Sequence, residues 1–173
     1  MSNGLFGSLN IPTKRQIFVS YHHSNDQWYY DEFSRIFNDT YDVIQDNSLE
    51  RVIDSDDPDY VMRRIRENYI TGTSCTILLC GAETSQRKYV DWEIKATLDK
   101  NHGLIGINLP SSISSGNGIM VPDRFNDNYH SGYAVWMQWQ ELTSHSLTQS
   151  IEIANSKSTS LINNTRQMRR RNG

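Results

Sequence analysis

A chain of 173 residues with a formal net charge of −3 has the length of one domain and can bury a single hydrophobic core. No window reaches the roughly 18 consecutive apolar residues of a membrane span. No charged-then-apolar signal sequence opens the chain, so we expect no membrane segment and a cytoplasmic location. The two cysteines, Cys75 and Cys80, fall in one apolar run, which is typical of free buried thiols in a reducing compartment.

Composition changes at both ends of the chain. Residues 1–13 are rich in Gly, Ser and Asn and predict a flexible arm, 14–156 the folded domain, and 157–173 a polar, basic tail. The last eight residues hold four arginines and no acid, which leaves the rest of the chain acidic. Because a nucleic-acid binder needs a basic face rather than a basic end, we expect a solvated, frayed tail and no nucleic-acid partner.

Apolar and β-branched runs predict five strands. These runs cover 15–21, 41–44, 75–80, 104–107 and 133–139. The intervening stretches are mostly predicted helices, whereas 110–133 is turn-rich and 45–58 is a long acidic connection. Strands that alternate with helices predict an α/β fold, a three-layer sandwich around a five-stranded parallel sheet. A chain of this size and type usually has the flavodoxin-like strand order 2-1-3-4-5.

Two of the predicted helices bear on function. The first follows an N-cap at Ser24 or Asn25, and its buried face is predicted to carry Trp28, Phe33, Ile36 and Phe37. The other follows a cap at Thr84 or Ser85 and continues to about residue 100. Its predicted buried stripe, at helical spacing, is Val90, Ile94, Thr97 and Leu98.

Glu93 borders this stripe and is flanked by Tyr89 and Trp92. A carboxylate in that setting can be held partly desolvated for function. The alternative is an ordinary glutamate at the edge of an amphipathic helix, paired with Lys88 or Lys100. The predicted strand order favours function, because it places the start of this helix beside the crevice where the strand order reverses.

The strand exits at that crevice are Tyr21-His22-His23 and Cys80-Gly81. The adjacent histidines point apart and have no third ligand at suitable spacing, so we expect no metal. The chain contains neither GxGxxG nor GxxxxGK[ST], and it therefore lacks the dinucleotide fingerprint and the P-loop. We expect no bound cofactor.

Two separated motifs resemble a known family. The segments FVSYHHSND (18–26) and TSQRKYVDWE (84–93) are similar to the TIR-like domains of bacteria, in particular to the Thoeris antiphage sensors of the ThsB type. The resemblance covers about residues 14–140 and implies the TIR strand order. It also implies cleavage of the nicotinamide–ribose bond of NAD+, because 89–93 (YVDWE) matches the family motif that ends in the catalytic glutamate.

The resemblance makes Glu93 the expected catalytic residue and NAD+ a substrate rather than a cofactor. Side chains expected to contact the substrate are Phe18, Ser20, Tyr21, His22, His23, Asn25, Asp46, Tyr89 and Trp92. The implied product is a cyclic ADP-ribose isomer or a related ADP-ribosyl signal that activates a partner effector after phage infection. A phage protein as the trigger and a homo-oligomer are further expected partners.

Two other functions fit the same sequence. A non-catalytic TIR-like module would signal by docking alone, and reversing the charge of the 45–58 segment would then abolish function whereas Glu93→Gln would not. A nucleoside deoxyribosyltransferase-like enzyme shares the sheet and a catalytic glutamate, and it would exchange nucleobases on free nucleosides.

Overall fold

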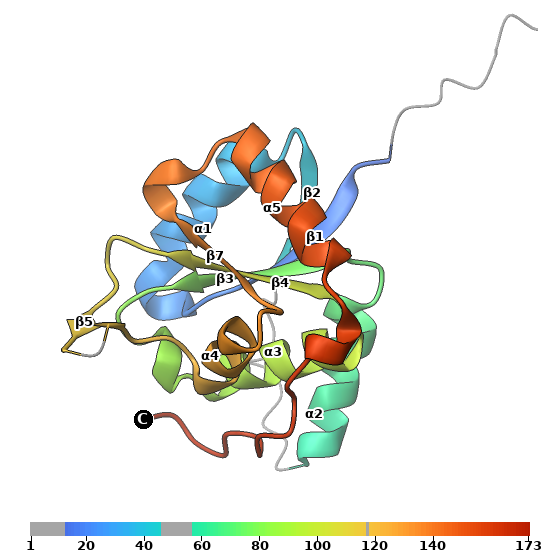
Figure 1. The fold of residues 1–173 in the computed structure, drawn as a ribbon, viewed down its shortest axis with the longest axis vertical. Helices are drawn as coiled ribbons and strands as arrows, with labels where there is room; N and C mark the ends of the chain where they lie inside the picture. The colour runs from blue at the N-terminus through green and yellow to red at the C-terminus, as the bar shows by residue number, and fades with distance from the viewer. Residues whose placement is uncertain (1–12, 46–56, 117) are drawn as a thin grey trace, which may run out of the picture.

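The computed structural model describes residues 13–45, 57–116 and 118–173 (Figure 1). Its central sheet has five parallel strands in the order β2-β1-β3-β4-β7. The strands are β1 Arg15–Ser20, β2 Tyr41–Gln45, β3 Cys75–Cys80, β4 Gly103–Asn108 and β7 Val135–Gln138. Because β7 is the fifth strand of this sheet in chain order, the predicted order 2-1-3-4-5 is confirmed.

Helices cover both faces of the sheet and make the predicted three layers (Figure 1). The helices on one face are α1 His23–Phe37 and α5 Ser144–Ser156. The helices on the other face are α2 Pro58–Ile65, α3 Lys88–Asp99 and α4 Asp123–His130. Shorter elements are the π-helical η1 Arg66–Ile70, the 3₁₀ turns η2 Thr84–Gln86, η3 Trp139–Glu141 and η4 Thr159–Leu161, and the ribbon strands β5 Ser114–Ser115 and β6 Gly118–Ile119.

Residue parity along the strands decides which side chains share a face of the sheet. In β1, Ile17 and Val19 pack in the core beneath α1 and α5, whereas Phe18 packs with α2 and α3. Cys75 and Cys80, five positions apart in β3, likewise lie in cores on opposite faces. Both are buried free thiols, as predicted.

Local sequence explains where two helices start. Asp57 caps α2, because its carboxylate accepts from the amides of Asp59 and Tyr60, and Pro58 occupies the first helical position. Thr143 and Ser146 form a reciprocal capping box at the start of α5, close to the predicted start of the last helix.

The predicted face of the first helix is partly wrong. Phe33 and Phe37 are buried, but Trp28 and Ile36 are 63% and 43% exposed, and Tyr30 packs in the core instead. The helix begins at His23, so Ser24 and Asn25 lie inside its first turn rather than capping it.

The predicted cap of the third helix is also wrong, although its stripe is confirmed. Thr84 and Ser85 belong to η2, and α3 begins only at Lys88. The Thr84 hydroxyl accepts from the amide of Gly81 and so closes the turn after β3. The predicted stripe 90–98 is buried, and Glu93 is buried with it rather than at its border.

The turn-rich region 110–133 contains a helix that the sequence pattern did not predict. Helix α4 buries Arg124 and Asn128 beside Phe125, so the residues of its buried face do not form an apolar stripe in the sequence. The end of the chain also differs from the expected frayed tail, because it runs along α4 and α3 and forms hydrogen bonds with both (Figure 1). The expected arm lies, except for residue 13, outside the described residues. No helix in the described part of the chain is long and apolar enough to cross a membrane.

Candidate functional site

The candidate site lies at the carboxyl end of β1, beside β3. Ser20 is the last residue of β1, and it is in register with Leu78 of β3. These are the strands at which the order of the sheet reverses, where open α/β sheets bind their ligands. Helix α3 follows β3 and packs over this part of the sheet.

Ser20 and Glu93 meet across the interface between β1 and α3. The Ser20 hydroxyl donates a hydrogen bond to Oε2 of Glu93. Both residues are buried, with 1% and 4% of their surface exposed. A hydroxyl that donates to a carboxylate is a strong, charge-assisted hydrogen bond, and it fixes the orientation of the carboxylate. A buried and oriented carboxylate therefore lies at the predicted crevice.

Apolar side chains of β1 and α3 pack on the same side of the sheet as this pair. Phe18 of β1 and Trp92 of α3 belong to one core cluster, together with residues of α2. Tyr89 is half-buried and meets Trp92 edge-on, with 5.6 Å between ring centroids. The Lys88 ammonium lies 4.9 Å from the Tyr89 ring and 5.2 Å from the Trp92 ring, within cation–π range. Phe18, Ser20, Tyr89, Trp92 and Glu93 thus lie along one side of the sheet.

Tyr21 and His23 lie on the other side of the sheet. Their rings stack 4.3 Å apart, and Tyr21 also stacks on Tyr30 in the core beneath α1. The Tyr21 hydroxyl is 2.7 Å from a side-chain oxygen of Gln27 and 2.6 Å from that of Gln45. Burial raises the pKa of the Tyr21 phenol above its ordinary value, so the hydroxyl stays protonated.

The other candidates follow β1 in the chain. His22 lies between β1 and α1 and is buried, with its Nε2 3.3 Å from the Ser24 hydroxyl. Asn25, in the first turn of α1, is exposed and donates to the Glu83 carboxylate at 2.9 Å, which connects the start of α1 to the loop after β3. Asp46 lies outside the described residues.

Asp26 is an unpredicted buried carboxylate at the same edge of the sheet. It accepts from the Ser111 hydroxyl at 3.2 Å and from the Thr84 hydroxyl at 3.5 Å, and so joins the first turn of α1 to the segments that follow β3 and β4. A Cβ atom at Gly81 would lie 2.2 Å from this carboxylate, so a larger residue there would have to displace the Asp26 side chain. Burial raises the pKa of Asp26, whereas the hydrogen bond from Ser111 lowers it.

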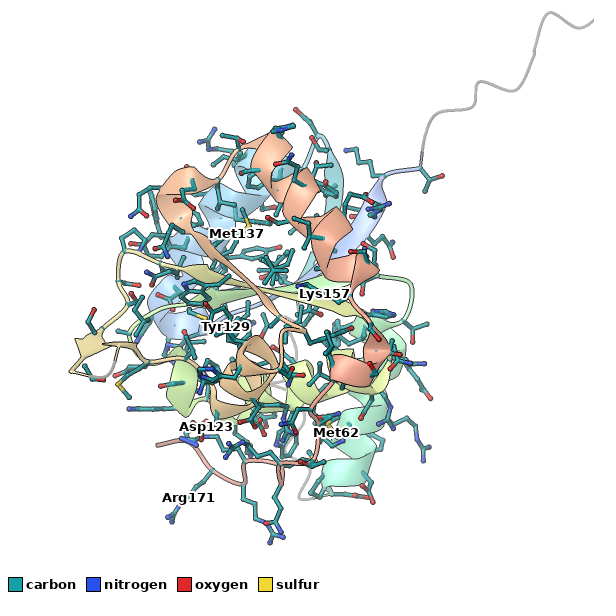
Figure 2. All side chains as sticks on the ribbon, in the orientation of Figure 1. Met62, Asp123, Tyr129, Met137, Lys157 and Arg171 are labelled. Carbon is teal, nitrogen blue, oxygen red and sulfur yellow. The ribbon has the colours of Figure 1, made fainter. Side chains whose placement is uncertain are left out.

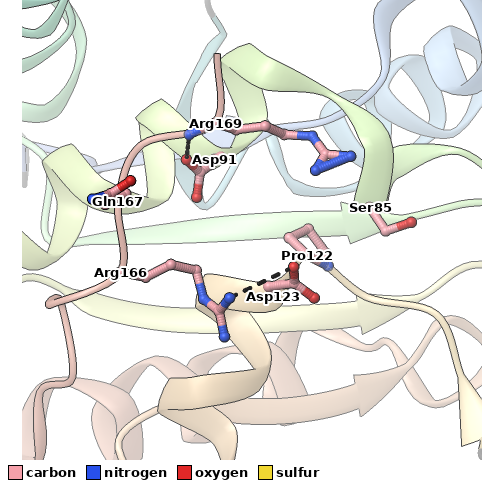
Figure 3. A pocket seen from close by; sticks show the side chains of 7 residues that line it. All are labelled: Ser85, Asp91, Pro122, Asp123, Arg166, Gln167 and Arg169. Carbon is pink, nitrogen blue, oxygen red and sulfur yellow. Dashed lines mark hydrogen bonds and ion pairs between the residues drawn. The ribbon is translucent and has the colours of Figure 1, made fainter. Parts of the chain in front are cut away.

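The rest of the described surface offers little support for another kind of site. In the described ranges no cluster of three or more histidine, cysteine or acidic residues could hold a metal ion. A cavity of about 320 Å³ lies between the chain end and α4, lined by Ser85, Asp91, Pro122, Asp123, Arg166, Gln167 and Arg169 (Figure 3). A second, of about 630 Å³, is lined in part by Lys88, Trp92 and Met168.

The chain matches the model of a protein family. The family described as Thoeris protein ThsB, TIR-like domain, matches residues 18–114, more than half of the chain. The match includes both Ser20 and Glu93 and extends from β1 through β4 to β5. No curated protein matches the chain. The matched sequence and the parallel sheet agree, and the chain belongs to the TIR-like domain family of the Thoeris protein ThsB.

Proposed function

We propose that this protein cleaves the nicotinamide–ribose bond of NAD+ and that Glu93 is its catalytic carboxylate. The observation that carries the proposal is the buried Glu93, held by the Ser20 hydroxyl at the carboxyl end of β1. Membership of the ThsB family is compatible with this activity. The position of Glu93 supports a reaction at the edge of the sheet where ligands of this fold class bind.

The chemistry requires one well-placed carboxylate. Nicotinamide is a cationic substituent in NAD+ and leaves as a neutral molecule when the electron pair of the C1′–N1 bond passes to its ring nitrogen. No general acid is needed for that step. The ribose left behind has oxocarbenium character, and a carboxylate in a water-poor site stabilises that positive charge as glycosidase carboxylates do. The apolar cluster of Phe18 and Trp92 limits access of water to Glu93.

The second step decides the product. A water molecule that attacks C1′ gives linear ADP-ribose, with its proton transferred to a base such as Glu93. A nucleophilic atom of the same ADP-ribosyl group gives a cyclic isomer instead. In a Thoeris system, we infer, the product diffuses to a separate effector, and phage infection activates its synthesis.

The direct test is nicotinamide release from NAD+ by wild type and by Glu93→Gln. Glutamine keeps the size of the side chain but removes its charge. We expect the rate to fall about 100- to 1,000-fold, which is the usual loss when one charge-stabilising group is removed. The matched control is Glu141→Gln, because Glu141 is exposed in η3, far along the chain from the site. It should release nicotinamide at the wild-type rate.

Three results would contradict the proposal. Equal rates for wild type and a folded Glu93→Gln would remove Glu93 from the reaction. Intact NAD+ with both proteins, including after addition of lysate from infected cells, would favour a docking module. Base exchange on free nucleosides without NAD+ cleavage would favour a deoxyribosyltransferase-like enzyme.

A further inference from the structure

The end of the chain, residues 163–173, forms a strap that lies across α4 and the first turns of α3 (Figure 1). The family match ends at residue 114, so nothing in that comparison assigns the strap a role. Its arginine-rich sequence suggested a solvated end. Its hydrogen bonds instead reach α4 and both ends of α3, and they include the turn of α3 that precedes Glu93.

A fully buried arginine connects the strap to both helices. Arg124 of α4 is 0% exposed, and its guanidinium donates to both carboxylate oxygens of Asp91, at 2.8 and 3.3 Å. The remaining donors reach the Asn164 side chain and the carbonyl oxygens of Arg166 and Gln167, at 2.9, 2.9 and 3.2 Å. A guanidinium has five N–H donors, so all five are used here and three of them need the strap.

The backbone of Arg169 is held at two consecutive positions of α3. Its amide donates to Oδ2 of Asp91 at 2.8 Å, and Figure 3 shows this contact. Its carbonyl accepts from the indole Nε1 of Trp92 at 2.7 Å. Asp91 and Trp92 immediately precede Glu93. The Arg169 backbone therefore fixes the rotation of the turn of α3 that carries the candidate catalytic residue.

The strap also completes the start of α3. Arg87, at the N-cap position, has no side-chain oxygen with which to accept from the exposed amides of the first turn. Asn172 supplies that acceptor, because its Oδ1 accepts from the Lys88 amide at 2.8 Å. Met168 packs against the apolar cluster that contains Phe18 and Trp92, so the strap extends toward the β1–α3 interface.

We propose that the strap positions α3 so that Glu93 meets the Ser20 hydroxyl, and that Asp91, Trp92 and Arg124 are positioning residues. The strap acts on Glu93 through its contacts with α3. Arg124 and Arg169 hold the first turns of α3 from outside, while Ser20 holds Glu93 from the sheet side. Loss of the outer contacts lets this turn rotate or fray, and the carboxylate leaves its place even though the rest of the sheet stays folded.

Two variants test this inference. Trp92→Phe removes one N–H donor and keeps an aromatic ring in the cluster. Removal of residues 163–173 takes away the whole strap. The first readout is the carboxyl carbon signal of Glu93 in ¹³C NMR, assigned by its absence in Glu93→Gln. We expect the signal to shift in both variants, because the Ser20 hydrogen bond is weakened.

The second readout is steady-state kinetics, and this arm rests on the proposed NAD+ cleavage. We expect kcat to fall about 10-fold in Trp92→Phe and about 100-fold without the strap, with little change in KM, because small misplacements of a catalytic group are costly. The control is Arg171→Ala, which removes a charge at an exposed position that points away from the body of the molecule (Figure 2). It should change neither readout.

The outcomes separate the two proposals. An unshifted Glu93 signal in a folded Trp92→Phe protein overturns the strap inference, as does a raised KM with unchanged kcat, which would make Trp92 a substrate contact. If the protein without residues 163–173 does not fold, the Trp92→Phe variant alone tests the strap inference. If wild type leaves NAD+ intact while the Glu93 signal responds to both variants, the proposed function fails and the strap inference stands.

Discussion

At the scale of single residues, the Ser20 hydroxyl is the group that fixes how the Glu93 carboxylate lies. Hydrogen bonds to charged groups contribute about 1.5–3 kcal/mol, or about 10- to 100-fold in a rate. We therefore expect Ser20→Ala to lower kcat for NAD+ cleavage by that factor and to leave KM nearly unchanged. Ser156→Ala, at the exposed end of α5, is the matched control.

Steady-state kinetics on both serine variants, with a thermal melt of each, measures this effect. Alanine fits the space of serine, so the fold should persist. A Ser20→Ala enzyme with wild-type kcat would show that the hydrogen bond does not serve the reaction.

The raised pKa of Asp26 makes the free energy of unfolding depend on pH. Burial raises its pKa above the ordinary value of 3.8. As pH rises past 3.8, the unfolded chain releases this proton before the folded protein does. The free energy of unfolding therefore falls with rising pH until Asp26 also ionises in the folded state. This contribution is present below the ordinary pKa and is lost above the raised one.

Asp26→Asn removes that contribution without removing the side-chain oxygen. We expect the difference in melting temperature, variant minus wild type, to increase over the pH range above about 4, because wild type loses the contribution of Asp26 there as this carboxyl ionises. Calorimetry across this range checks the sign. Parallel curves for the two proteins would mean that Asp26 is not perturbed by burial.

At the scale of elements, β3 is buried along its whole length and carries both thiols. Burial raises the pKa of Cys75 to about 12 and raises that of Cys80 as well. Because the thiolate is the reactive form, we expect neither cysteine to react with a disulfide reagent in the folded protein at pH 8. Both should react in urea, which serves as the control. Rapid labelling of the folded protein would contradict the burial of β3.

The strands were predictable because their signal is local. The all-apolar run of β3 and the parity of Cys75 and Cys80 need no knowledge of distant segments. Helix α4 was not predictable in this way. Its buried Arg124 and Asn128 are satisfied by Asp91 and by residues 163–167, which no local period in α4 reveals.

The candidate site was predicted in part. Glu93 followed from a sequence motif, and its position near the end of β1 followed from the strand order, but its hydrogen bond with Ser20 was not predicted. Tyr21 and His23 were expected beside them but lie across the sheet, because consecutive strand residues alternate in direction. Asp26 was missed because its partners Ser111 and Thr84 come from two other loops.

At the scale of the whole molecule, the arrangement of the sheet and α3 explains why residues 73 positions apart meet at the candidate site. Strands β1 and β3 bring the two ends of the candidate site together, and α3 carries the carboxylate over them. The strap adds a third, distant segment beyond the matched region. Helix α3, which carries Glu93, thus contacts the sheet through Ser20 and the end of the chain through Asp91.

The most direct test of the account follows the fate of NAD+ labelled in its ADP-ribose part. Wild type and Glu93→Gln are incubated with it, alone and in lysate of phage-infected cells, and the products are identified by mass spectrometry. We expect nicotinamide and a labelled ADP-ribose product from wild type only. Intact NAD+ with folded wild type in both settings, or equal conversion by Glu93→Gln, would contradict it.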